Sequence, residues 1–334
     1  MAAYGVRRLK DTFLKMPREY EVNTMNIITL TFNPAFDIHC NVPNFAPYHE
    51  NLAYVISRDA GGKGVNISRA LTVCGVDNLA FVVLGDENGD GFERALKDDG
   101  MCYKAITVKG RIRENMTFHT EGMPETRVSF QGFSLSRELF DRAIELLFDD
   151  VDENTVLTFT GRAPTGIDIS QVKELLVRFA HKGAKIVIDS RSFSLDDLRQ
   201  IKPWLIKPNQ EEISEYLGRE IDSFEQIVSV AKELHKDGIE NVMISLGSEG
   251  AMLVCNEGIF VAKPPRINAI STIGAGDSSI AGFLAAAKMG EGAENRLCTA
   301  VAYGSAACLT EGTRPPRRED VIKLLPLVNL KTVK

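Results

Sequence analysis

Two glycine-rich segments contain the residues whose types and spacing suit chemistry. In the second, Gly274, Ala275, Gly276 and Asp277 directly precede a run of small and apolar residues that predicts a buried helix. A helix that begins with small residues directs unpaired backbone N–H groups outward, and these groups stabilise charge on a transferring phosphoryl group. Asp277 is the candidate base that takes the proton of an attacking hydroxyl. The alternative is that this carboxylate only caps the helix.

The first glycine-rich segment predicts a second ligand-binding turn. Gly61, Gly62 and Gly64 precede a helical pattern, where glycine lets the backbone approach a ligand and present N–H groups to it. Lys63 adds a cation, and Asn66 adds an amide that can both donate and accept. Because Gly64 follows Lys63 directly, the segment is not a Walker A loop, and it does not match GxGxxG either. The alternative is a tight turn with a solvated lysine.

The elements that position these segments alternate along the chain. Apolar, β-branched runs predict strands at Ile27–Phe32, Leu79–Leu84, Thr155–Thr160, Lys185–Ile188, Trp204–Ile206, Asn241–Ser245 and Ala251–Cys255. Helical patterns lie between them at Gly64–Cys74, Gly91–Asp98, Ser136–Phe148, Ile169–His181, Glu211–Leu217 and Ser223–Lys236. This alternation predicts an α/β fold, a doubly wound and mostly parallel sheet with helices on both faces. Ligands bind beyond the carboxyl ends of such strands.

Two segments interrupt the alternation. Residues 38–58 and 106–130 show strand-like polar and apolar alternation without an intervening helix. They predict a small antiparallel β lid over the pocket of a single large domain, residues 25–330. Residues 1–24 lack the apolar centre of a secretory signal, and we expect them to form an N-terminal extension, disordered or artefactual.

The composition excludes several classes of function. A formal net charge of −6 argues against nucleic-acid binding, and no apolar run is long enough to span a membrane. The six cysteines are scattered without paired spacing, which is typical of reduced thiols and favours a cytoplasmic location. The five histidines are dispersed and show no spacing typical of zinc ligands.

Together, the two glycine-rich segments resemble the two signatures of the ribokinase-like (PfkB) carbohydrate kinases. The resemblance extends over residues 25–325, and it is closest to the branch that includes 1-phosphofructokinase and tagatose-6-phosphate kinase. The segments that resemble this branch are Thr29–Asp37, Pro203–Glu212, Ile244–Ala251 and Ala262–Pro265. The resemblance implies a ribokinase-like fold and transfer of phosphate from ATP to a sugar hydroxyl.

The resemblance also implies roles on the sugar side of the site. Asp37 would hydrogen-bond sugar hydroxyls, whereas the residues alone leave it equally well explained as a loop cap. An arginine followed two residues later by asparagine fits Arg113 and Asn115, so Arg113 and Arg111 become candidates for binding a phosphate on the sugar. Without the resemblance, the run of charged residues that includes Arg111 and Arg113 is typical of a solvated face. The residues that would hold sugar hydroxyls or phosphate from the first glycine-rich segment are Gly61, Gly62, Lys63 and Asn66.

On the nucleotide side, the resemblance implies binding of ATP and Mg²⁺. Asn209 and Glu212 match an NxxE motif that supports Mg²⁺ through water, and the alternative is an acid-rich helix start. The residues that would line the nucleotide site are Lys207, Asn209, Ser245, Gly247, Gly250, Gly274 and Gly276.

Two departures from the family pattern fall on the sugar side. Arg162 stands where the family has a small hydroxyl residue, so it adds a phosphate contact or alters the choice of sugar. The segment His49–Leu52 replaces a glycine-led GEVN.

The expected function is phosphorylation of a ketose phosphate, with fructose 1-phosphate as the first candidate and tagatose 6-phosphate as the alternative. Two further alternatives are a kinase of an unphosphorylated sugar or nucleoside and a non-catalytic sugar-phosphate sensor. An oxidoreductase is disfavoured because no GxGxxG follows the first strand. The resemblance implies a homodimer formed through the β lid.

Overall fold

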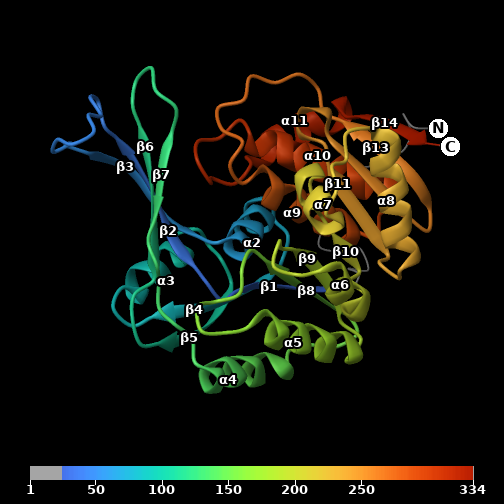
Figure 1. The fold of residues 1–334 in the computed structure, drawn as a ribbon, viewed down its shortest axis with the longest axis horizontal. Helices are drawn as coiled ribbons and strands as arrows, with labels where there is room; N and C mark the ends of the chain where they lie inside the picture. The colour runs from blue at the N-terminus through green and yellow to red at the C-terminus, as the bar shows by residue number, and fades with distance from the viewer. Residues whose placement is uncertain (1–24, 334) are drawn as a thin grey trace.

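A computed structural model describes residues 25–333, so the expected extension at residues 1–24 lies outside the described residues. The described chain forms an α/β fold with one large and one small sheet (Figure 1). The large sheet has ten strands within residues 25–333. From edge to edge they are β14 (Asn329–Val333), β13 (Gly258–Lys263), β12 (Ala251–Cys255), β11 (Asn241–Ser245), β10 (Leu205–Ile206), β9 (Lys185–Asp189), β8 (Thr155–Thr160), β1 (Asn26–Thr31), β4 (Leu79–Gly85) and β5 (Tyr103–Val108).

The large sheet is mostly parallel. Neighbouring strands from β11 to β5 run parallel, whereas β12, β13 and β14 join the sheet through antiparallel pairings. Successive side chains of a strand point to opposite faces. Ile28 and Leu30 of β1 therefore pack in one core, and Ile27 packs in the other. Burial on both faces explains why the central strands are continuous apolar runs.

Helices cover both faces of the large sheet. The core on one face receives side chains from α3 (Gly89–Asp98), α4 (Arg137–Phe148), α5 (Ile169–His181), α6 (Leu195–Ile201), α7 (Gln210–Leu217) and α8 (Phe224–Lys236). The core on the other face is formed with α2 (Lys63–Val73), α9 (Ala275–Lys288), α10 (Ala293–Ala307) and α11 (Arg318–Leu324). Short 3₁₀ helices, η1 (Gly247–Glu249) and η2 (Leu325–Leu327), complete the elements. Within residues 25–333, no helix has the length and apolar character needed to cross a membrane.

Helices α9 and α10 pack closely because glycines face the neighbouring helix. A Cβ atom at Gly282 of α9 would lie 2.6 Å from the backbone oxygen of Thr299 on α10. A Cβ atom at Gly304 of α10 would meet Ser279 Oγ on α9. This contact holds α9 firmly in the core. The first turn of α9 carries Asp277.

The small sheet stands apart from the large one at the left of Figure 1 and is formed by four strands of the described chain. In spatial order they are β3 (Tyr54–Gly61), β2 (Ala35–Asn41), β6 (Arg113–His119) and β7 (Thr126–Ser129). β2 pairs with β3 and β6 with β7 in antiparallel fashion, while β2 and β6 join the two pairs through a parallel ladder.

The predicted elements agree with this structure within two residues at each end. Both segments that interrupt the alternation contribute to the small sheet, although β2 already begins at Ala35 and the second segment includes the end of β5. Strands β13 and β14 were not predicted. They form the antiparallel edge of the large sheet.

Candidate active site

The two glycine-rich segments meet at one end of the large sheet. Asn66 Nδ2 on α2 donates to Asp277 Oδ2 on α9 at 3.0 Å, although 211 residues separate the two in sequence. The carboxyl end of β9 reaches the same place, because Asp189 accepts a hydrogen bond from Lys63 of α2. The site therefore lies where parallel α/β sheets bind ligands, beyond the strand ends.

Asp277 lies in the first turn of α9 and is only 7% exposed. Gly274 is the N-cap, with a φ of 79° that glycine adopts without strain, and no side chain caps this helix. Burial raises the pKa of Asp277 to about 6, while Lys63 opposes this rise and Asp189 adds to it. The carboxylate is not used as a cap, and its pKa near neutrality suits a general base.

Lys207 lies beside the start of α9. The first N–H groups of a helix have no partner within it, and they direct positive charge outward. A Cβ atom at Gly276 would lie 3.2 Å from Lys207 Nζ, so the ammonium group lies directly beside this turn. Gly274, Ala275 and Gly276 leave the backbone open to a negatively charged group.

Asp189 joins the two sides of the site. It is 4% exposed, and its carboxylate accepts from Lys63 Nζ at 2.8 Å and lies 3.5 Å from Lys207 Nζ. Burial alone would raise the pKa of Asp189, but the two lysines more than offset this and hold it below its usual range. Sequence reasoning missed this residue. The signal was a single acid at the end of the apolar run that forms β9.

The glycine turn before α2 places backbone against the sugar-side residues. A Cβ atom at Gly61 would meet the carboxylate of Asp37, and one at Gly62 would lie 2.8 Å from Thr31 Cγ2. Gly62 also has a φ of 116°, which residues with a Cβ atom rarely adopt. Only glycine therefore allows the N-terminus of α2 to lie this close to Asp37.

Two arginines of the small sheet, Arg113 and Arg127, lie around the buried carboxylate of Asp37 and its partner Asn115. Asn115 Nδ2 donates to Asp37 Oδ1 at 2.8 Å, and Arg127 Nη2 lies 3.5 Å from the same oxygen. Arg113 Nη1 lies 3.4 Å from Asn115 Oδ1, and its buried Nε has no partner among the described residues. Burial lowers the pKa of Arg113; Asp37 opposes this effect, and Arg127 and Arg162 lower the pKa further. We call Asp37, Arg113, Arg127 and Arg162 the Asp37 group.

The other two arginines predicted from the sequence, Arg162 and Arg111, form no ion pair or hydrogen bond with Asp37 or Asn115. Arg162 is exposed in the turn after β8 and forms no ion pair within residues 25–333. Arg111 pairs instead with Glu114 at 3.2 Å. Glu114 stands opposite Phe36 in the β2–β6 ladder, on the other face from Asp37 and Asn115. The structure therefore does not bring Arg111 to the Asp37 group, whereas Arg127, to which sequence reasoning gave no role, belongs to it.

The predicted nucleotide-side residues lie around the ends of β10 and β11. Asn209 and Glu212 form a capping box at the start of α7: Glu212 N donates to Asn209 Oδ1 at 2.8 Å, and Asn209 N donates to Glu212 Oε2 at 2.9 Å. Ser245 N donates to the backbone oxygen of Pro208 at 3.0 Å. Gly247 and Gly250 bound the η1 turn, where a Cβ atom at Gly250 would meet the backbone oxygen of Ala262.

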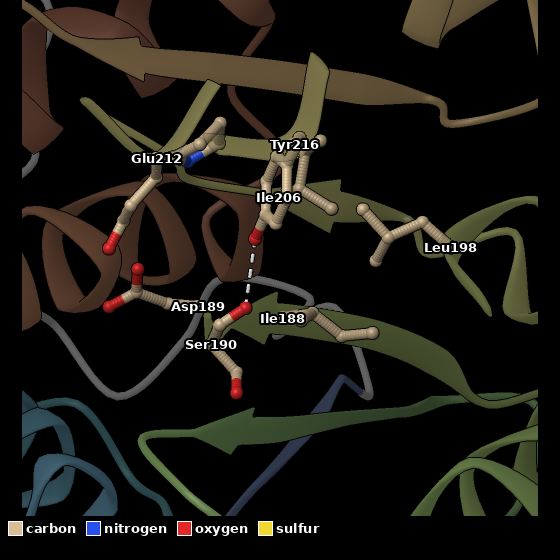
Figure 2. A pocket seen from close by; sticks show the side chains of 8 residues that line it. Ile188, Asp189, Ser190, Leu198, Ile206, Glu212 and Tyr216 are labelled. Carbon is tan, nitrogen blue, oxygen red and sulfur yellow. Dashed lines mark hydrogen bonds between the residues drawn. The ribbon is translucent and has the colours of Figure 1, made fainter. Parts of the chain in front are cut away.

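Glu212 faces Asp189 across a small cavity of about 10 Å³, shown in Figure 2. Its lining residues are Ile188, Asp189, Ser190, Leu198, Ile206, Pro208, Glu212 and Tyr216. No cluster of three or more His, Cys, Asp or Glu side chains within residues 25–333 is placed to hold a metal directly. Carboxylate oxygens suit Mg²⁺, which keeps much of its water. Asn209 and Glu212 therefore fit a cation held through water.

Comparisons with known proteins agree with this geometry. Residues 31–320 match the model of the pfkB family carbohydrate kinases. The 1-phosphofructokinase of Escherichia coli strain K12 is 31% identical over 83% of this chain and 89% of its own length. That of Bacillus subtilis is 31% identical over 91% of this chain and 99% of its own. The crystal structure of E. coli phosphofructokinase-2 with substrates and products superimposes with a TM-score of 0.85 at 26% identity, covering 91% of this chain and 99% of that one.

These matches confirm the predicted family and the ribokinase-like fold. They also exclude the oxidoreductase alternative, and they imply ATP as a substrate. The chain belongs to the pfkB family of carbohydrate kinases and is a phosphotransferase that acts on a sugar hydroxyl.

Proposed function

We propose that this chain is a 1-phosphofructokinase, which transfers the terminal phosphoryl group of ATP to fructose 1-phosphate and forms fructose 1,6-bisphosphate. The names of its curated relatives support this assignment. Tagatose 6-phosphate is the alternative acceptor, and an unphosphorylated sugar or nucleoside is a third. The observation that carries the proposal for a phosphorylated acceptor is the Asp37 group.

The charges of the Asp37 group favour a phosphorylated sugar. Arg127 and Arg162 lower the pKa of Arg113 through their like charge, and Asp37 opposes them, so positive charge gathers around Arg113. A phosphomonoester carries about −1.5 to −2 at pH 7, so it balances this positive charge. The buried Nε of Arg113 has no partner among the described residues, and a phosphate oxygen is a strong, charge-assisted acceptor for this guanidinium. The phosphate therefore binds at Arg113 and Arg127, with Arg162 at the exposed side.

The acceptor hydroxyl is activated between the two glycine-rich segments. Asp37 and the backbone at Gly61 and Gly62 orient the sugar hydroxyls. Asn66 donates to one oxygen of Asp277, so the other oxygen is available for the proton of the attacking hydroxyl. This arrangement gives positioning together with general-base catalysis, as phosphoryl transfer requires.

The donor side neutralises the charge that develops during transfer. Lys207 and the N–H groups of residues 274–277 stabilise the transferring phosphoryl group. ATP lies along Ser245, Gly247 and Gly250. Asn209 and Glu212 would hold Mg²⁺ through water, and such a cation would supply neutralisation of phosphate charge.

The small sheet acts as a lid and as a dimer surface in this proposal. Of the 13 exposed large apolar residues found within residues 25–333, eight lie in its strands and connecting loops. They are Tyr48, Leu52, Tyr54, Val55, Ile56, Met123, Val128 and Phe130. So concentrated an apolar surface is typical of an interface. A second copy of the chain would cover it through the same lid.

Replacing Asp277 by Asn removes the base while it keeps the shape of the side chain. We expect D277N to lower kcat by at least about 10²-fold, the range for a positioned base. D90N is the matched control, since Asp90 is also an acid in the first turn of a helix, α3. It should stay within about twofold of wild type. A coupled ADP-release assay measures both, and D277N turning over within about tenfold of wild type would contradict the assignment.

The raised pKa of Asp277 predicts how kcat depends on pH. The base works only when ionised, so kcat should fall as the pH drops through about 6. Saturating acceptor is used because the acceptor phosphate also titrates near pH 6. The residual rate of D277N should lack this acidic limb. If D277N keeps the same limb, another group is responsible for it.

Arg113→Ala tests the phosphate site, and Arg111→Ala is its control two residues away. We expect R113A to raise KM for fructose 1-phosphate by about 10- to 100-fold, since a charge-assisted hydrogen bond is lost. R111A should change it by less than about threefold. The assay compares fructose 1-phosphate, tagatose 6-phosphate and free fructose. Fastest turnover of free fructose, or an equal effect of R113A on all three, would overturn the phosphate site.

Val55→Asp tests the dimer surface. We expect wild type to sediment as a dimer at micromolar concentration and V55D as a monomer, because a charge is placed in the apolar contact. Leu146→Asp is the control, since Leu146 is an exposed leucine on α4 outside the lid. It should remain dimeric in analytical ultracentrifugation. A monomeric wild type, or a dimeric V55D, would rule out this surface.

A further inference from the structure

Arg191, in the turn after β9, binds three carboxylates of α7. Its Nε donates to Glu212 Oε1 at 2.9 Å, its Nη2 to Glu211 Oε2 at 3.0 Å and its Nη1 to Glu215 Oε1 at 3.4 Å. Glu212 is the inner partner, with 11% of its side chain exposed, whereas Glu211 and Glu215 are 71% and 52% exposed. The guanidinium therefore joins the edge of the site to the protein surface.

Glu212 uses both carboxylate oxygens within the protein. Oε2 accepts from Asn209 N in the capping box, and Oε1 accepts from Arg191. Its charge still reaches the site, since it contributes to raising the pKa of Lys63. A cation held through water at Glu212 must share Oε1 with the guanidinium or displace it. Arg191 thus lies in direct competition with a divalent cation.

Glu211 and Glu215 offer Arg191 alternative partners if its contact to Glu212 is released. Its side chain is 45% exposed, and Glu211 and Glu215 already accept from it. If the Nε contact to Glu212 is released, the guanidinium keeps two carboxylate partners. Its charge stays close to Glu212, so it still opposes a second positive charge there. The strength of this opposition depends on the arginine's charge.

We propose that Arg191 is a positioning residue that holds Glu212 in place and lowers the affinity of this edge of the site for free divalent cations. The inference rests on the proposed role of Glu212 in supporting Mg²⁺ through water. The contacts of Arg191 are to the three glutamates of α7. Its function is to restrict cation binding at Glu212 to the cation that arrives with the nucleotide.

The test measures Mn²⁺ binding to the full-length, nucleotide-free enzyme by electron paramagnetic resonance of free Mn²⁺. R191Q should bind Mn²⁺ about three- to tenfold more tightly than wild type, because a nearby positive charge is removed. R191K keeps the charge and should stay within about twofold of wild type. R199Q is the matched control: Arg199 on α6 also pairs with two carboxylates, Asp196 and Asp237, and is 49% exposed.

The double variant R191Q/E212Q shows whether the gain passes through Glu212. It should lose the tighter binding of R191Q. Unchanged Mn²⁺ affinity in R191Q, an equal gain in R199Q, or a gain that persists in the double variant would each overturn the proposal.

The metal role of Glu212 is tested separately by E212Q alone, in the dependence of kcat on free Mg²⁺ at fixed MgATP. An unchanged dependence in E212Q would remove the proposed metal role. R191Q that binds Mn²⁺ as wild type does, while E212Q shifts the Mg²⁺ dependence, would remove only the role of Arg191.

Discussion

The rest of the site depends on the buried Asp189 carboxylate and its two lysines. A charge buried this deeply is costly unless it is paired and hydrogen-bonded, and Lys63 and Lys207 supply that pairing from opposite directions. Lys63 begins α2 on the proposed sugar side, whereas Lys207 lies beside Gly276, where we propose that the phosphoryl group is transferred. A single carboxylate at the end of β9 therefore sets the positions of two cations. Removing it would leave both lysines without their shared partner. The distance between the proposed sugar and nucleotide sites would then no longer be fixed.

The same low exposure that makes this pairing necessary also prepares Asp277 for its role. Burial raises the pKa of Asp277 toward neutrality, but Lys63 lies close enough to keep the rise moderate. Asn66 orients the carboxylate without protonating it. A base with an ordinary aspartate pKa would be weaker, and one raised much further would be protonated at neutral pH. This intermediate pKa of Asp277 requires that α2 and α9 be in contact. The small residues of both glycine segments allow that contact.

Sequence reasoning predicted what depends on local pattern. The strands and helices that it predicted end within two residues of those in the structure, and Asn66 and Asp277 of the two glycine segments meet, but it left out β13, β14, α6, α10 and α11. It missed what depends on register. Arg127 joins the Asp37 group only because β7 pairs with β6 as it does. Arg111 is drawn to Glu114, three residues along the chain, and Glu114 lies on the face of the small sheet opposite to Asp37 and Asn115. Asp189 looks like the end of an apolar strand until the reach of two lysines, 126 and 18 residues away in sequence, is known.

Three consecutive residues after the apolar part of β9 serve three parts of the site. Asp189 pairs with the lysines, Ser190 Oγ donates to the backbone oxygen of Gly161 in the turn that carries Arg162, and Arg191 holds Glu212. Asp189 ends the strand and Arg191 lies in the turn that follows, so the chain changes direction here and one short segment reaches all three. The two inner residues are buried, and a change there disturbs the pairing of charges. Arg191 is half-exposed and has outer partners, so replacing it leaves the pairing of Asp189 with the two lysines in place. If Arg191 acts as proposed, a change at this position alters cation affinity without altering the proposed base or the sugar side.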